Sequence, residues 1–149
     1  MGMREEWTHI VRKILSSGRV PVEVIGELRH MQPNHELSYE PGRAIRQAIE
    51  SLEYLDTEGW LLITRLINSA KFYRTDVRDA LLERFSPSNR SCCPDATEAR
   101  AAVLATLLNM KYRFYPVDLI EEIDIKNEMP DLWRTAWRRC GIEEHMPVT

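Results

Sequence analysis

Carboxylates crowd one short segment of the chain, and their spacing is the first sign of a surface that could do chemistry. Between residues 118 and 131 they stand against a single lysine, and they are Asp118, Glu121, Glu122, Asp124, Glu128 and Asp131. On a helix, residues three and four apart share a face, where like charges repel by about 0.2–0.5 kcal/mol. A basic partner would relieve this repulsion, so we predict that the first five bind a basic protein. A solvated helix face and a carboxylate pair for general acid–base catalysis are the alternatives.

A second candidate surface combines aromatic and basic side chains. Trp133 and Trp137 stand four residues apart, as do Arg134 and Arg138. Tryptophan and arginine are enriched at protein–protein hot spots, so the pattern predicts an anchor for a partner protein. The alternative places both indole rings in the core and leaves the arginines in solvent. A second copy of the chain could use the same stripe, so a homodimer is a further interpretation.

Two other segments mix basic and aromatic residues. They are residues 71–74 (Lys-Phe-Tyr-Arg) and 111–115 (Lys-Tyr-Arg-Phe-Tyr). Such clusters can stack the bases of a single-stranded nucleic acid. They are also typical of helix ends, where cations complement the carboxyl-terminal dipole. Nucleic-acid binding is therefore a second hypothesis, behind protein binding.

Residues that could hold a metal ion or act as nucleophiles show no informative spacing. The candidates are His30, His35, Cys92, Cys93, Cys140 and His145. The chain has no Cys-x-x-Cys pair, no His-Glu-x-x-His helix and no Gly-x-Ser-x-Gly elbow, and its glycines form no phosphate-binding loop. We therefore predict no catalytic residues, no metal site and no cofactor.

Composition limits the class of protein. The 149 residues are 44% hydrophobic and 29% charged, which is close to an ordinary globular domain. The net charge of −3 argues against a general binder of duplex nucleic acid. The chain lacks an apolar run long enough for a membrane span and the layout of a signal peptide. We expect a cytoplasmic protein with free thiols and no membrane partner.

The elements that must position these residues are helices. Hydrophobic residues recur three or four positions apart, as in the stripe formed by Trp7, Ile10 and Ile14, whereas sustained alternation is absent. The same periodicity predicts five helices before residue 86, over about 7–17, 21–31, 41–55, 57–70 and 75–85.

Residues that start or stop helices mark the boundaries of these five segments. Gly18 ends the first helix and Pro21 opens the second, which together predict a helical hairpin. Pro41 is expected to open the third helix after a polar stretch. Residue 56 or 57 is expected to cap the fourth helix, and Thr75 the fifth.

The second half of the chain predicts a loop and three more helices. Residues 86–94 are rich in serine and proline and predict a loop that separates five helices from three. Asp95 and Glu98 have the spacing of a capping box, and the helix that follows, through Met110, should be the most buried. Shorter helices follow Pro116 and Pro130.

These elements predict an all-α fold: a single domain of seven or eight short helices over residues 1–149, arranged as stacked helical hairpins. The arrangement is either an irregular bundle or a degenerate α-helical repeat. Residues 21–28 and 116–123 agree in residue type at nearly every position, which favours a repeat. Residues 76–81 resemble the second helix of HEAT-type repeats, but the match is short and its spacing differs, so it identifies no family.

The function best suited to this pattern is a non-catalytic protein–protein interaction module. An inhibitor, immunity protein or adaptor that binds a basic partner through the acidic face would be an example. A single-stranded nucleic-acid-binding protein and an enzyme with a helical active site are the alternatives.

Overall fold

The computed structural model describes residues 6–51, 56–85, 97–113 and 130–140, with their side chains except those of 111–113 and 140. Every regular element in these ranges is an α-helix, which confirms the predicted all-α class. The helices are α1 (Trp7–Ser17), α2 (Val22–Met31), α3 (His35–Glu50), α4 (Thr57–Ala70), α5 (Thr75–Phe85), α6 (Thr97–Arg113) and α8 (Pro130–Cys140). None of the described helices is both long enough and apolar enough to cross a membrane.

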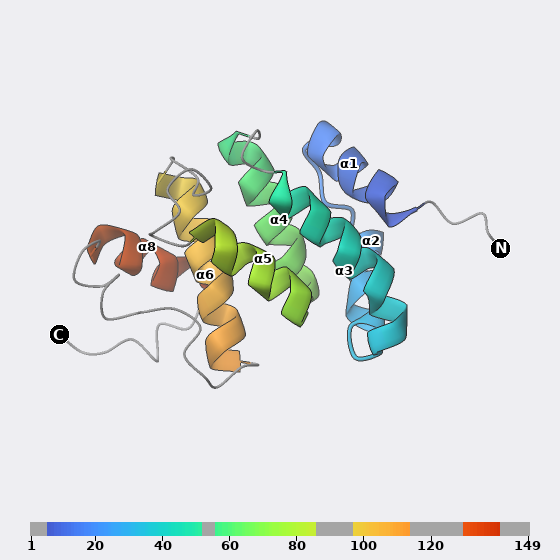
Figure 1. Ribbon diagram of the computed structural model, residues 1–149. Helices are drawn as coiled ribbons and strands as arrows, with labels where there is room; N and C mark the ends of the chain where they lie inside the picture. Colours follow the sequence, from blue (N-terminus) through green and yellow to red (C-terminus); the bar gives the residue numbers. More distant parts are fainter. Residues whose placement is uncertain (1–5, 52–55, 86–96, 114–129, 141–149) are drawn as a thin grey trace.

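The helices stack in two rows, so that the described part of the molecule extends from α1 at one end to α8 at the other (Figure 1). In one row α1 packs on α3 and α3 on α5, while in the other α2 packs on α4, α4 on α6 and α6 on α8. Contacts of α1 with α4, α2 with α3 and α5 with α6 join the two rows. Each helix from α1 to α6 therefore needs apolar residues toward more than one neighbour.

Most predicted helix boundaries match local geometry. Gly18 has a left-handed φ of 73°, and its N–H donates to the Ile14 carbonyl at 3.0 Å, which closes α1. The Asp56 carboxylate accepts from the Gly59 N–H at 3.1 Å and caps α4. The second helix begins at Val22, so Pro21 is its N-cap residue and stands one position before the first turn in which it was expected.

The prediction for the third helix is wrong at its start. α3 begins at His35, and Pro41 lies inside it instead of opening it. The side chain of Asn34 accepts from the Leu37 N–H at 3.1 Å, so the polar stretch supplies the cap and the first turn. A proline there removes one helical hydrogen bond, but the cap and contacts from another helix hold the turn in place.

The fifth helix spans the predicted residues, but Thr75 is not its cap. The Arg78 N–H donates to the Arg74 carbonyl at 2.9 Å, so Arg74 occupies the capping position and Thr75 is the first helical residue. This difference is the usual uncertainty of one residue at a helix end.

The core runs through the middle of the stack and is densest around α6. Ala99 and every residue from 101 to 110 are buried, so α6 is enclosed on all sides by its neighbours. Two polar residues, Thr106 and Asn109, are buried with it. The prediction that this helix is the most buried is confirmed for the described residues.

Several predictions fall outside the described residues. They concern residues 52–55 of the third predicted helix, the loop at 86–94, the Asp95 cap, the helix after Pro116 and the closing Gly141. The division into five and three helices and the internal repeat therefore stay predictions.

Candidate protein-binding groove

A groove lies between α1 and α2. These two helices, predicted to form a hairpin, make few direct contacts with each other, because each packs mainly on α3 and α4. The groove has a volume of about 470 Å³. Its walls are Trp7, Ile10, Lys13, Ile14, Ser16, Ser17, Arg19, Pro21, Val24, Glu27 and Met31.

Both walls carry side chains at helical spacing. On α1, Trp7, Ile10 and Ile14 stand at i, i+3 and i+7. On α2, Val24 and Met31 are seven residues apart. Ile14 is buried and forms part of the floor, whereas the other four are partly exposed. Two such ridges of side chains with a furrow between them are the surface into which a further helix packs.

Charged and hydroxyl side chains border the groove. Lys13 and Arg19 lie near the end where α1 stops, and Glu27 belongs to the α2 wall. Ser16 and Ser17 are exposed at the same end of α1. The groove therefore has an apolar interior and a rim that carries charges of both signs.

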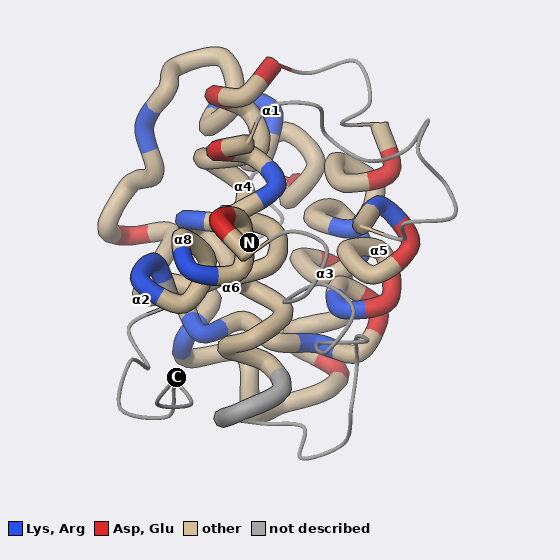
Figure 2. The backbone as a smooth tube through the Cα atoms, turned by 90° about the vertical axis from the view of Figure 1, so that its left-hand side faces the viewer, with Lys and Arg blue, Asp and Glu red and all other residues tan. Residues whose placement is uncertain are grey.

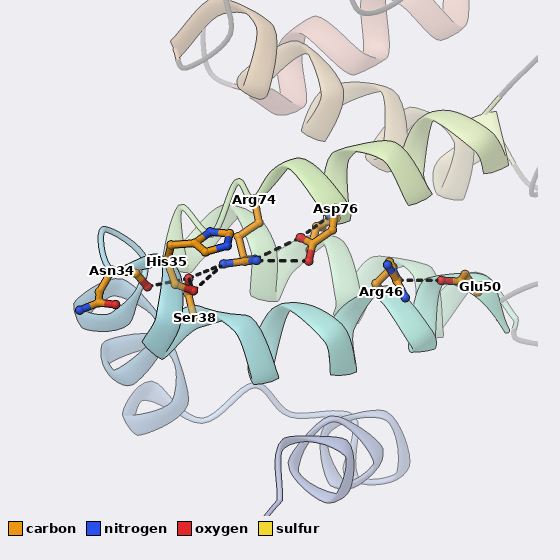
Figure 3. Close-up of polar contacts among 8 residues, drawn as sticks. Asn34, His35, Ser38, Arg46, Glu50, Arg74 and Asp76 are labelled. Atoms are coloured by element: carbon orange, nitrogen blue, oxygen red, sulfur yellow. Dashed lines mark hydrogen bonds and ion pairs between the residues drawn. The ribbon is translucent and has the colours of Figure 1, made fainter.

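Behind this groove, hydrogen bonds from the Arg74 side chain hold two helices together, and we call this cluster the Arg74 clamp. The Arg74 guanidinium donates to the Ser38 hydroxyl at 2.5 Å and to the His35 carbonyl at 3.2 Å, and both belong to α3. It also binds the Asp76 carboxylate, with Nε to Oδ1 at 3.1 Å (Figure 3). Only 9% of the Arg74 side chain is exposed. Arg74 therefore joins the start of α5 to the first turns of α3.

A second polar cluster joins α4 to α6 inside the core. The Asn68 amide group donates to the Thr106 hydroxyl at 2.9 Å, and its carbonyl accepts from Tyr73 at 3.0 Å and from Asn109 at 3.2 Å. The carbonyl oxygen of the Asn109 side chain is buried without a hydrogen-bond partner among the described residues. A buried cluster of this kind fixes the register of the helices that share it.

The predicted acidic surface cannot be compared with these features, because its residues lie outside the described ranges. They are Asp118, Glu121, Glu122, Asp124 and Glu128. Asp131, the last carboxylate of that segment, lies 3.6 Å from Arg134 in an exposed ion pair.

The predicted tryptophan and arginine anchor is divided between the core and the surface. Trp133 is 5% exposed and Trp137 is fully buried, with their ring centroids 5.6 Å apart in an edge-to-face arrangement. Arg134 and Arg138 are exposed. In this structure a partner would meet the arginines and not the rings. The binding role of the arginines stays a prediction.

The first basic and aromatic segment has no exposed ring. Phe72 and Tyr73 are buried, and Arg74 is held in the clamp. Of the second segment, residues 111–113 belong to α6 but their side chains lie outside the described set. The described part of these segments therefore offers no aromatic surface on which bases could stack.

The described residues contain no group of three histidine, cysteine or acidic side chains that could hold a metal ion. His9, His30 and His35 are each exposed. Cys92, Cys93, Cys140 and His145 have no described side chain, so the expectation of no metal site is untested for them.

Comparison with known proteins identifies no relative. No family model, no curated protein and no solved structure matches the chain.

The sequence pattern predicted that the apolar residues of α1 and α2 belong to the core, so it did not predict the groove. Trp7, Ile10 and Val24 carry the same periodic signal as residues that face another helix.

Proposed function

We propose that this protein is a non-catalytic interaction module that binds an amphipathic helix of a partner protein in the groove between α1 and α2. The observation that carries the proposal is the helical spacing of side chains on both walls. A partner helix with apolar residues at i, i+3, i+4 and i+7 would place them between Trp7 and Val24, as in other helix-in-groove complexes.

The rim charges support a specific kind of partner helix. Lys13 and Arg19 favour acidic residues at one end of the bound helix, and Glu27 favours a basic residue beside the α2 wall. Such rim pairs contribute mainly to orientation and to the rate of association, whereas burial of the apolar face supplies the affinity.

Use as an inhibitor, immunity protein or adaptor is compatible with this site. The acidic segment at 118–128 remains a proposed second surface for a basic partner. Charge reversal of Asp118, Glu121 and Glu122 to lysine would test that surface separately from the groove.

A display library of 15-residue helical peptides, selected against the full chain, tests the groove. We expect enriched peptides with apolar residues at i, i+3, i+4 and i+7 that bind with a micromolar Kd. The blocking variant Ser16→Trp adds a large ring at an exposed position on the groove wall and removes no core side chain. It should weaken binding by about tenfold or more, which is about 1.4 kcal/mol.

The matched control is Ser51→Trp, since Ser51 is also an exposed serine at the end of a helix but lies outside the groove. Its affinity for the peptides should equal that of the unmodified chain. Failure to enrich any helical peptide, or equal binding by both variants, would refute the proposal. Dimerisation that Ser16→Trp abolishes would refute it as well, because the groove would then belong to a second copy.

A further inference from the structure

A smaller pocket on the second row of helices is lined by two arginines from different elements. It lies where α4, α6 and α8 meet and has a volume of about 260 Å³. Arg65 of α4 and Arg139 of α8 both line it, together with Leu61, Thr64, Asn68, Ser69, Ala102 and Ala105. No acidic side chain is among these lining residues.

Among the described residues, acidic side chains are few on the helix segments that line the pocket. Residues 101–110 of α6 include no charged side chain, and the acidic residue of this helix is Glu98, in its first turn. On α4 the nearest acidic residue in sequence is Glu58, seven residues before Arg65, which is about 10 Å along a helix. On α8 it is Asp131, which already pairs with Arg134. Acidic positions instead follow one another along α3 and α5, whereas α8 is mainly basic (Figure 2).

The base of the pocket is held by hydrogen bonds that leave its shape little freedom. Asn68 is fixed by Thr106, Tyr73 and Asn109. The Ser69 carbonyl accepts from Arg29 twice, from Nε at 3.1 Å and from Nη2 at 2.7 Å. A third guanidinium from α2 is therefore anchored beside the pocket. The base of the pocket therefore needs little rearrangement when a ligand binds.

We propose that the pocket formed by Arg65 and Arg139 binds a phosphate monoester. Two guanidinium groups match the two negative charges of a monoester, and arginine binds phosphate oxygens through paired hydrogen bonds. The hydroxyl of Ser69, which also lines the pocket, can add a donor. A nucleic-acid backbone fits less well, because each diester carries one charge and the protein has a net charge of −3.

The pocket shares no lining residue with the groove between α1 and α2, so the two sites can be tested separately. The monoester could belong to a small phosphorylated molecule or to a phosphorylated side chain of a partner. Both sources present the same group to the two arginines.

Backbone amide NMR spectra of the full chain, titrated with inorganic phosphate against sodium chloride of equal ionic strength, test this site. We expect phosphate-specific shifts at Arg65, Ser69 and Arg139. The variants Arg65→Gln and Arg139→Gln should each weaken phosphate binding by about tenfold, since charged hydrogen bonds have that weight. Both residues are exposed, so the fold should survive.

The matched control is Arg46→Gln on α3, where Arg46 is exposed and pairs with Glu50 at 3.0 Å. It should leave phosphate binding unchanged. Phosphoserine and a neutral peptide that carries one phosphoserine distinguish the two sources: tighter binding of the peptide than of the free amino acid indicates a side chain on a partner. No shift with phosphate, an equal loss in all three variants, or preference for a single-stranded oligonucleotide would overturn the proposal.

Discussion

Arg74 occupies the space into which a side chain on Gly42 would project. A β-carbon on Gly42 would stand 2.5 Å from Arg74 Nε and 2.7 Å from its Cδ. Gly42 is buried in the middle of α3, one residue after Pro41. The absence of a side chain at this position lets the guanidinium reach Ser38 and Asp76. Glycine is therefore needed here to make room for Arg74, and not to form a turn.

Gly42→Ala should therefore destabilise the protein despite the better helix propensity of alanine. The propensity gain is about 1 kcal/mol, whereas overpacking costs about 1–3 kcal/mol and also strains the hydrogen bonds of Arg74. We expect a net loss of about 1–2 kcal/mol in the free energy of unfolding, measured with urea. In an Arg74→Ala background the same substitution should become stabilising; a loss of equal size in both backgrounds would show that the clamp is not the cause.

Asp76→Ala should cost more than Asp79→Ala, although both residues are acidic and lie in α5. Asp76 faces a guanidinium that is 9% exposed, so its removal leaves a nearly buried charge without its carboxylate. Asp79 pairs with Arg78 but is itself 61% exposed. We expect losses of about 1.5–3 and under about 0.5 kcal/mol, respectively. Equal denaturation midpoints for the two variants would contradict this role of Asp76.

Asn68→Leu should destabilise the protein more than Asn109→Leu does. The first change removes the acceptor used by Tyr73 and Asn109, for an expected loss of about 2–4 kcal/mol. The second removes one hydrogen bond but also a buried carbonyl that lacks a partner among the described residues, so we expect less than about 1 kcal/mol. Thermal unfolding of both variants by circular dichroism gives the comparison, and the reverse order would argue against the assigned network.

Leu107→Ala should lower stability by about 2–5 kcal/mol, since Leu107 is fully buried in α6 and its truncation leaves a cavity. Leu37→Ala is the control, because Leu37 is 51% exposed on α3. We expect its effect to stay within about 0.5 kcal/mol. An unchanged denaturant midpoint for Leu107→Ala would place this residue outside the core.

Local patterns were enough to predict the helices that depend on neighbouring residues alone. The spacing of Trp7, Ile10 and Ile14 predicts α1, and Gly18 predicts its end, because periodicity and a left-handed closing residue act within a few positions of the chain. Asp56 caps α4 for the same reason. The prediction that Pro41 opens the third helix was wrong. The preference of proline for a first turn is also local, but Asn34 caps this helix earlier in the chain.

The sequence by itself determined that the described chain is helical and which face of most helices is apolar. Tertiary structure decided which of those faces is covered: α1 and α2 diverge and leave a groove, whereas Trp133 and Trp137 meet α6 and are buried. It also brought together residues that no local pattern connects, such as Gly42 with Arg74 and Arg65 with Arg139. The physical reason is that helix formation depends on contacts within one or two turns, while burial and charge pairing depend on which distant segment lies opposite.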